Sequence, residues 1–245
     1  MSNSIFIQKE RQMRILEEKI LASGLIMKEI LEEAKNLYNP NPFHNFLHAL
    51  NVASYILELP GDKFSGLELR SMLVAALFHD AGHTGIAQPL DEFISLSLMT
   101  ETLEKIQKKY PDFVIDNSIV RNSIMGTVFK ERGKRENRYS VILSDFDIGY
   151  IGKGIESFLY YGPLFALELN VSADDFFTKI EKGYFKYLMS VNKEIFLSKE
   201  AKLILPYSLQ TIVDFYKIDL EKKKEMFSVL KTEDITLDEF KTRFF

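Results

Sequence analysis

Two short stretches decide how this sequence is interpreted: FHNFLHALNV at residues 43–52 and LFHDAGHTG at residues 77–85. They contain all four histidines of the 245-residue chain: His44, His48, His79 and His83. Within each stretch the two histidines are four residues apart, which places them on one face of a helix. Asp80 directly follows His79 at the end of an apolar run. Since a buried carboxylate is costly unless it is paired or binds a metal, the pattern indicates a mixed histidine and aspartate metal site.

The composition sets limits on the class of protein. Apolar residues make up 46% and charged residues 27% of the chain, which is ordinary for a soluble globular protein. The net charge of -4 and the dispersed basic residues give no sign of a nucleic-acid-binding face. There is no cysteine, so disulfides and thiolate metal sites are excluded. With no secretory signal and no apolar run longer than Met72–Phe78, we expect a cytoplasmic protein without a membrane partner.

Apolar residues recur at helical spacing along most of the chain, and no alternating strand pattern is found. We therefore predict an all-α fold, with residues 1–245 forming a single compact multi-helix domain. Residues 67–83 are apolar nearly all round, which is typical of a buried helix. A single helix is expected over 207–230, and Thr236 and Glu239 have capping-box spacing for a last short helix. The predicted parts are an N-terminal helical cap, a metal-site core and C-terminal helices, at 1–38, 43–203 and 207–245.

The two histidine stretches together are more specific than either alone. HNFLHA followed by HDAGHTG resembles the HD superfamily of metal-dependent phosphohydrolases, and within it the class I 3',5'-cyclic nucleotide phosphodiesterases. That family carries HNxxHA, then HDxxHxG about thirty residues later, then a distant aspartate on another helix. The segment VILSDFD at 141–147 best supplies that aspartate. Asp145, which ends the apolar run, is the preferred ligand, and Asp147 is the alternative.

The resemblance implies a role for each matching side chain. It implies four ligands for a tightly held zinc, iron, manganese or nickel ion: His48, His79, Asp80 and Asp145. Asp80 would also bridge to a second ion, magnesium or manganese, held largely by waters. His44 matches the histidine that protonates the leaving oxygen, and His83 matches the one that lines the water shell of the second metal.

Elementary chemistry supports such a division of labour. Hydrolysis of a phosphodiester needs a nucleophile at neutral pH and stabilisation of charge at phosphorus, and two bridged metals supply both. The leaving alkoxide needs a proton, which a histidine near its reference pKa can give. His44 is the candidate because it lies one helical turn from a ligand and need not be a ligand itself.

Several positions depart from the family pattern. Phe43 stands where the family has tyrosine, so a hydroxyl is missing at the edge of the site, and Gln88 replaces an asparagine. Glu104 is a candidate for the glutamate that contacts the metal-bound water in relatives, and Thr127 for a threonine near the same water shell.

The largest departure concerns the base of the substrate. Family members read a purine with a glutamine, and a phenylalanine three residues later stacks on the ring. In KIEKGYFKYL at 179–188, Phe185 takes the place of that phenylalanine and puts Lys182 at the glutamine position. Lysine only donates hydrogen bonds, whereas a glutamine amide both donates and accepts. Ordinary helix packing is the alternative interpretation of Phe185.

The sequence thus predicts a metal-dependent phosphodiesterase that hydrolyses a 3',5'-cyclic nucleotide, or a similar small phosphodiester, to a monophosphate. An HD-type nucleotidase acting on another nucleotide is the first alternative, because of Lys182. A metal-binding regulatory module without turnover is the second, although a purely structural site would not need His44. The expected partner is a small nucleotide, and the N-terminal helices are a possible homodimer surface.

Overall fold

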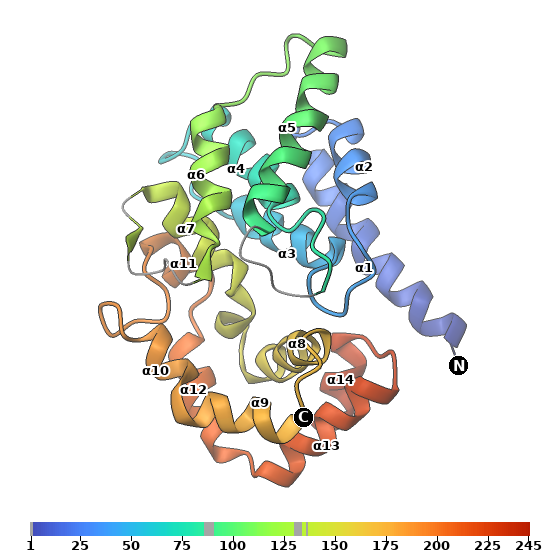
Figure 1. Ribbon diagram of the computed structural model, residues 1–245, viewed down its shortest axis with the longest axis vertical. Coiled ribbons are helices and arrows are strands. Elements are labelled where there is room, and N and C mark those ends of the chain that lie inside the picture. The colour runs from blue at the N-terminus through green and yellow to red at the C-terminus, as the bar shows by residue number, and fades with distance from the viewer. Residues whose placement is uncertain (1, 86–90, 130–133, 136) are drawn as a thin grey trace. The chain divides into compact units, whose positions relative to one another are not determined.

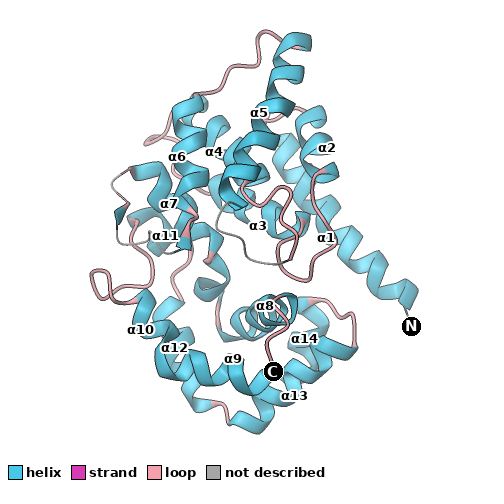
Figure 2. Cartoon of the chain, viewed as in Figure 1, coloured by secondary structure: helices cyan, strands magenta, loops and turns pink. Residues whose placement is uncertain are grey.

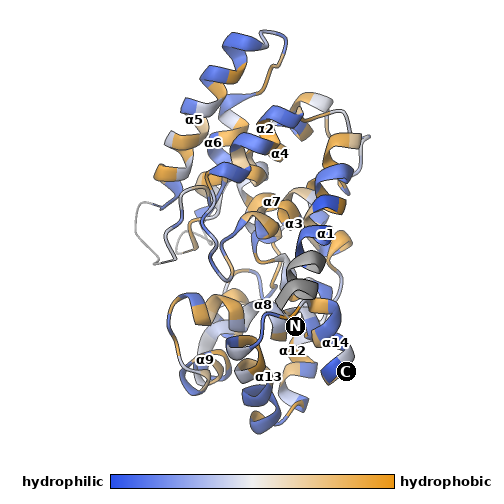
Figure 3. Cartoon of the chain, turned by 90° about the vertical axis from the view of Figure 1, so that its right-hand side faces the viewer, coloured by the Kyte–Doolittle hydropathy of each residue, from blue (hydrophilic) through white to orange (hydrophobic). Residues whose placement is uncertain are grey.

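The regular secondary structure of the described residues consists of helices, which loops and turns connect (Figures 1 and 2). In this computed structural model the described residues are 2–85, 91–129, 134–135 and 137–245, so Gln88 lies outside them. No strand occurs in these ranges, and the predicted all-α class is confirmed. None of the described helices is both long enough and apolar enough to cross a membrane. Most helices carry hydrophobic and hydrophilic positions together (Figure 3).

Contacts divide the chain into two compact units. The first, which we call the histidine-bearing unit, is Met13–Asp147, and the second, the C-terminal unit, is Ile148–Phe245 with Met1–Gln12. Helix α1 (Ser2–Ala22) contributes to both. The predicted domain boundaries stay a prediction.

The histidine-bearing unit is built around one buried helix. Its elements after α1 are α2 (Lys28–Asn36), α3 (Phe46–Ile56), α4 (Gly66–Phe78), α5 (Asp91–Lys109), α6 (Asn117–Gly126) and α7 (Arg138–Asp147). Helix α4 packs against α3 and α6, and α6 packs against α7. Ser65 and Glu68 form a capping box at the start of α4. Every side chain from Ser71 to Phe78 is fully buried, as the apolar pattern of this segment predicts.

A glycine lets two of these helices approach closely. Gly126, the last residue of α6, lies against the first turns of α7. A Cβ atom on Gly126 would come within 2.5 Å of the Cα atom and of the carbonyl oxygen of Ser140. The position of α7, and of the aspartates at its end, therefore depends on residue 126 being a glycine.

The C-terminal unit encloses a phenylalanine-rich core. Its elements are η2 (Gly149–Lys153), α8 (Ile155–Glu168), α9 (Ala173–Lys179), η3 (Ile180–Tyr184), α10 (Phe185–Leu188), α11 (Lys199–Ile204), α12 (Ser208–Lys217), α13 (Leu220–Thr232) and α14 (Leu237–Phe244). Helix α8 packs against α12, α13 and α14. The capping box predicted at Thr236 and Glu239 is present at the start of α14.

One expected helix is in fact two. The segment 207–230 divides into α12 and α13, because Ile218 and Asp219 adopt extended backbone angles. The Asp219 carboxylate accepts a hydrogen bond from the backbone N–H of Lys222 and caps α13. The apolar spacing continues across this break, so periodicity alone merges the two helices.

Candidate metal centre

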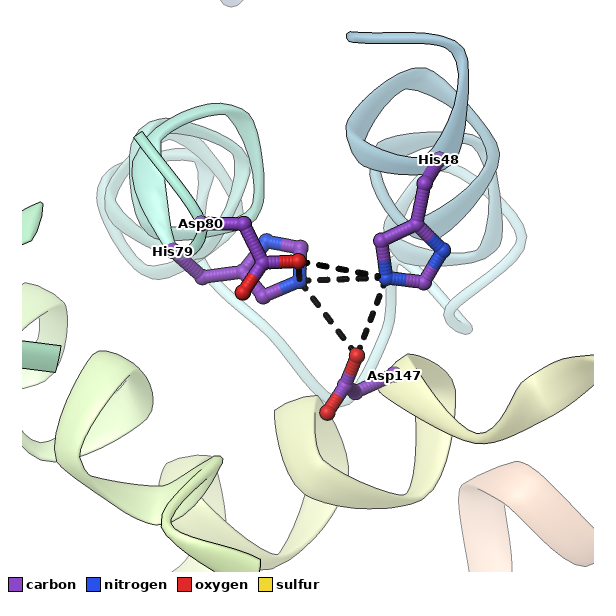
Figure 4. A group of neighbouring side chains, drawn as sticks. All are labelled: His48, His79, Asp80 and Asp147. Atoms are coloured by element: carbon purple, nitrogen blue, oxygen red, sulfur yellow. Dashed lines mark hydrogen bonds and ion pairs between the residues drawn. The ribbon is translucent and has the colours of Figure 1, made fainter. Parts of the chain in front are cut away.

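Four side chains of the histidine-bearing unit converge on one point (Figure 4). His48 lies in the first turn of α3, where Asn45 caps the helix by accepting from the backbone N–H of His48. His79 and Asp80 directly follow α4, and Asp147 is the last residue of α7. Three helix ends, far apart in the sequence, thus bring two imidazoles and two carboxylates together.

The spacing of the donor atoms fits a metal ion. The Nε2 atom of His48 lies 3.0 Å from Oδ1 of Asp147, and Nε2 of His79 lies 3.0 Å from Oδ2 of Asp80. The two Nε2 atoms are 3.3 Å apart, and the remaining histidine–aspartate distances are 3.4 and 3.5 Å. Ligands bound at about 2.0–2.2 Å in tetrahedral or octahedral geometry are separated by roughly 3.0–3.5 Å.

The hydrogen bonds around His79 give a second reason to expect a cation. Its Nδ1 atom lies 2.9 Å from the carbonyl oxygen of Ala76, to which only an N–H can donate. A neutral His79 therefore presents the lone pair of Nε2 to the Asp80 carboxylate. Oδ2 of Asp80 is buried and accepts no hydrogen bond. Two electron-pair donors 3.0 Å apart need a proton or a metal ion between them.

The electrostatics agree with this arrangement. Burial alone would lower the pKa of His79, but the Asp80 and Asp147 carboxylates outweigh it and raise that pKa well above the ordinary value. Burial would likewise raise the pKa of Asp147, yet hydrogen bonds with His48 and His79 lower it to about 2. Burial would also raise the pKa of Asp80, but the neighbouring histidines, His79 above all, lower it below its ordinary value. Both carboxylates are therefore ionised at neutral pH, which is the state that binds a cation.

The expectation that Asp145 supplies the carboxylate is corrected by this geometry. The group of potential ligands contains Asp147, the alternative, and not Asp145. Both residues lie on α7, where positions two apart point about 200° away from each other. Only one of the two can face His48 and His79, and the side chain of Asp145 is fully buried in the helix packing instead.

His44 and His83 form a second pair beside this group. Their rings stack with centroids 4.0 Å apart and an interplanar angle of 25°. The Phe43 ring lies 4.9 Å from the His44 ring and 4.6 Å from the His48 ring. The structure therefore brings the remaining two histidines together without making either one a member of the His48–Asp147 group.

Two further predicted residues lie outside the group. Thr127 follows α6 as its C-cap and donates to the carbonyl oxygen of Ile124 at 2.7 Å. Glu104 is exposed on α5. Glu92, in the first turn of α5, is affected by the charges of the centre. Burial raises its pKa, and the negative charges of Asp80, Asp91 and Asp147 raise it further. No motif marks Glu92 in the sequence.

The predicted substrate residues lie in the C-terminal unit. Lys182 is exposed in the single π-helical turn η3. Phe185 is 3% exposed and packs against Phe158 and Phe215, with centroid distances of 5.2 and 5.6 Å. The structure thus places Phe185 in the aromatic core, which is the packing alternative.

A glutamine followed three residues later by an apolar side chain also occurs on α12. Gln210 is exposed there, and Val213 is 50% exposed. Leu209 and Tyr216 continue the same open apolar face. Because valine rather than phenylalanine follows Gln210 by three residues, the pair departs from the family pattern, and its helical spacing predicts only ordinary packing.

Comparisons with known proteins agree with the fold and with the histidine stretches. Residues 43–93 match the family described as 3'5'-cyclic nucleotide phosphodiesterase. Among solved structures, the chain is similar to the phosphodiesterase domain of the RhoPDE fusion protein from the choanoflagellate Salpingoeca rosetta, with 17% identity, a TM-score of 0.57 and coverage of 95% of this chain and 94% of that one. No curated protein matches the sequence.

Two further structures show the same similarity. A second structure of the Salpingoeca rosetta rhodopsin phosphodiesterase domain has 17% identity, a TM-score of 0.64 and coverage of 94% of this chain and 92% of that one. LmjPDEB1 in complex with IBMX has 16% identity, a TM-score of 0.58 and coverage of 92% and 88%. The predicted resemblance to class I phosphodiesterases is confirmed: the three structures share the fold of this chain, and the family match covers residues 43–93, which contain both histidine stretches.

Proposed function

We propose that this chain hydrolyses a 3',5'-cyclic nucleotide, or a similar small phosphodiester, to a monoester in a metal-dependent reaction. The observation that carries the proposal is the convergence of His48, His79, Asp80 and Asp147, with a buried oxygen of Asp80 left without a hydrogen bond. The match of residues 43–93 to the cyclic nucleotide phosphodiesterase family supports the same substrate class.

These four side chains would hold the tightly bound ion, which we infer to be zinc, iron, manganese or nickel. Asp80 would also contribute to a second site for magnesium or manganese. Two bound divalent ions supply a hydroxide nucleophile near neutral pH and stabilise charge at phosphorus. Ala76 keeps His79 in the tautomer that ligates through Nε2, since its carbonyl accepts the Nδ1 proton.

His44 would give the proton to the leaving oxygen. It lies beside the ligand group without belonging to it, and its ring stacks on His83. His83 would order the water around the second ion, with Glu104, Thr127 or Glu92 as further contacts of that water. Phe43 and Lys182 stay proposed contacts of the substrate base, and Gln210 is added as an alternative to Lys182. Phe185, proposed from the sequence as a stacking residue, packs in the aromatic core instead.

Metal content tests the ligand assignment. Asp147→Asn should reduce the bound metal to well below one tight ion per chain, measured by elemental analysis after purification without chelators. Asp145→Asn is the matched control on the same helix, and it should keep its metal once correct folding is verified by circular dichroism. Loss of metal in Asp145→Asn alone would overturn the assignment.

Activity tests the reaction class. The metal-loaded protein should hydrolyse at least one member of a panel containing cyclic AMP, cyclic GMP, deoxynucleotides and a generic bis-phosphodiester. His44→Gln should lower kcat by about a hundredfold or more while metal content is unchanged. Activity confined to a deoxynucleotide would favour the HD-type nucleotidase that Lys182 suggests. Full metal occupancy without turnover of any member would favour a regulatory module.

A further inference from the structure

The carbonyl oxygen of His83 accepts two side-chain hydrogen bonds from the turn that precedes α3. Nδ2 of Asn39 donates to it at 2.8 Å, and Nδ2 of Asn41 donates to it at 2.9 Å. The neighbouring backbone is joined in the same way, because the N–H of Gly82 donates to the carbonyl of Leu37 at 3.0 Å. The turn at residues 37–41 is therefore bonded directly to the turn that carries Asp80 and His83.

Asn41 makes a second contact that Asn39 lacks. Its Nδ2 atom also lies 3.2 Å from the carbonyl oxygen of His44. One amide group thus holds the backbone of His44 and the backbone of His83, which lie 39 residues apart in the sequence and whose rings stack. Asn41 is itself fixed, because Nδ2 of Asn45 donates to its carbonyl at 2.9 Å while Asn45 caps α3.

The ring of His83, on which the His44 ring stacks, is held in one orientation by its own contacts. Its Nδ1 atom accepts from the backbone N–H of Gly85 at 3.0 Å, so the proton of the neutral ring is on Nε2. That nitrogen lies 3.5 Å from Oδ2 of Asp91 at the start of α5. Both ring nitrogens and the carbonyl of His83 therefore have partners, and the Asn41 amide connects the backbone of His44 to this fixed residue.

We propose that Asn41 is a positioning residue that sets the orientation of His44 by fastening its backbone to that of His83. The catalytic consequence rests on the proposed function, in which His44 gives a proton to the leaving oxygen. Displacement of a reacting group by about 1 Å can cost on the order of a hundredfold in rate. A single lost donor at Asn41 therefore affects proton transfer more than metal binding.

The test compares Asn41→Asp with Asn39→Asp. Both variants keep the shape of the side chain, add one negative charge and lose the amide donor. Only the first removes the bond to His44, and Asn41→Ala checks that its effect is not due to charge. Because the chain has four histidines, ¹⁵N-histidine labelling gives few ring signals, and His44→Gln and His83→Gln assign two of them in zinc- and magnesium-loaded protein.

Asn41→Asp and Asn41→Ala should shift the His44 ring signals and lower kcat at least tenfold, with metal content unchanged and KM within about twofold of its original value. Asn39→Asp should leave the His44 signals in place. Unchanged His44 signals in both Asn41 variants, or equal shifts in Asn39→Asp, would overturn the proposal. If the unsubstituted protein hydrolyses no phosphodiester, the proposed function fails, while the ring signals still decide the role of Asn41.

Discussion

At the scale of single residues, the state of His79 depends on what occupies the metal centre. Without metal, the two carboxylates favour a proton on Nε2 and raise the pKa of His79. With metal, the same lone pair becomes a ligand and the proton must leave. The centre is therefore either an ion pair or a metal site, and pH affects the two states differently.

We expect the metal-free protein to lose stability as pH rises. When folding raises the pKa of a histidine, the protonated ring stabilises the folded state. This contribution is complete below the pKa of the unfolded chain, near 6.5, and is lost as pH rises through the folded pKa. The contribution of Asp147 to stability has the opposite pH dependence. It is present above the unfolded pKa of 3.8 and is lost as pH falls towards the folded pKa of about 2. The thermal midpoint of chelator-treated protein should thus fall as pH rises above about 6.5.

The control for this pH dependence is His79→Gln, which should flatten the decline in the chelator-treated state. Metal-loaded protein should show no comparable decline over the same range, because metal binding requires the deprotonated ring. An equal decline in His79→Gln would mean that another group causes it.

At the scale of elements, the centre depends on where helices end. His48 lies at the start of α3, while His79 and Asp147 lie at the ends of α4 and α7. Helix ends offer unpaired backbone groups, and the chain uses them: Asn45 caps α3, and the Ala76 carbonyl near the end of α4 orients His79. A small shift of α7 against α6 would move Asp147 away from the imidazoles.

Gly126→Ala tests this dependence. The added methyl group would collide with the backbone of Ser140 at 2.5 Å, so α7 must shift. We expect a loss of about 1–3 kcal/mol in the free energy of unfolding and weaker metal binding. Denaturant unfolding and metal titration measure the two effects.

Gly66→Ala is the matched control, because nothing lies within 4 Å of its added Cβ at the start of α4. It should be neutral or slightly stabilising. Metal affinity unchanged in Gly126→Ala would show that α7 tolerates the shift without moving Asp147.

At the scale of the whole molecule, the candidate metal-binding and catalytic residues gather in one of the two units. All four potential ligands of the main group lie in the histidine-bearing unit, as do His44, His83 and Asn41. Within that unit, a bound ion would link α3, α4 and α7, although His48 and Asp147 are 99 residues apart in sequence. The metal is therefore expected to stabilise this unit first.

Hydrogen exchange with and without chelator tests that expectation. Removal of the metal should reduce amide protection most in α3, α4 and α7, and less in α8, α13 and α14 of the C-terminal unit. An equal loss of protection in both units would show that the metal stabilises the chain as a whole.

The sequence by itself determined the helical class and the histidine motifs, because both are local patterns. The spacing of four predicts that His44 and His48, and likewise His79 and His83, share a helix face, and this is wrong: His44 precedes α3, and His79 and His83 follow the end of α4 at Phe78. Only the tertiary structure decided between Asp145 and Asp147, placed Phe185 in a core and joined His44 to His83 through Asn41. Those outcomes depend on how helices distant in sequence rotate and pack against one another, and local spacing carries no information about that rotation.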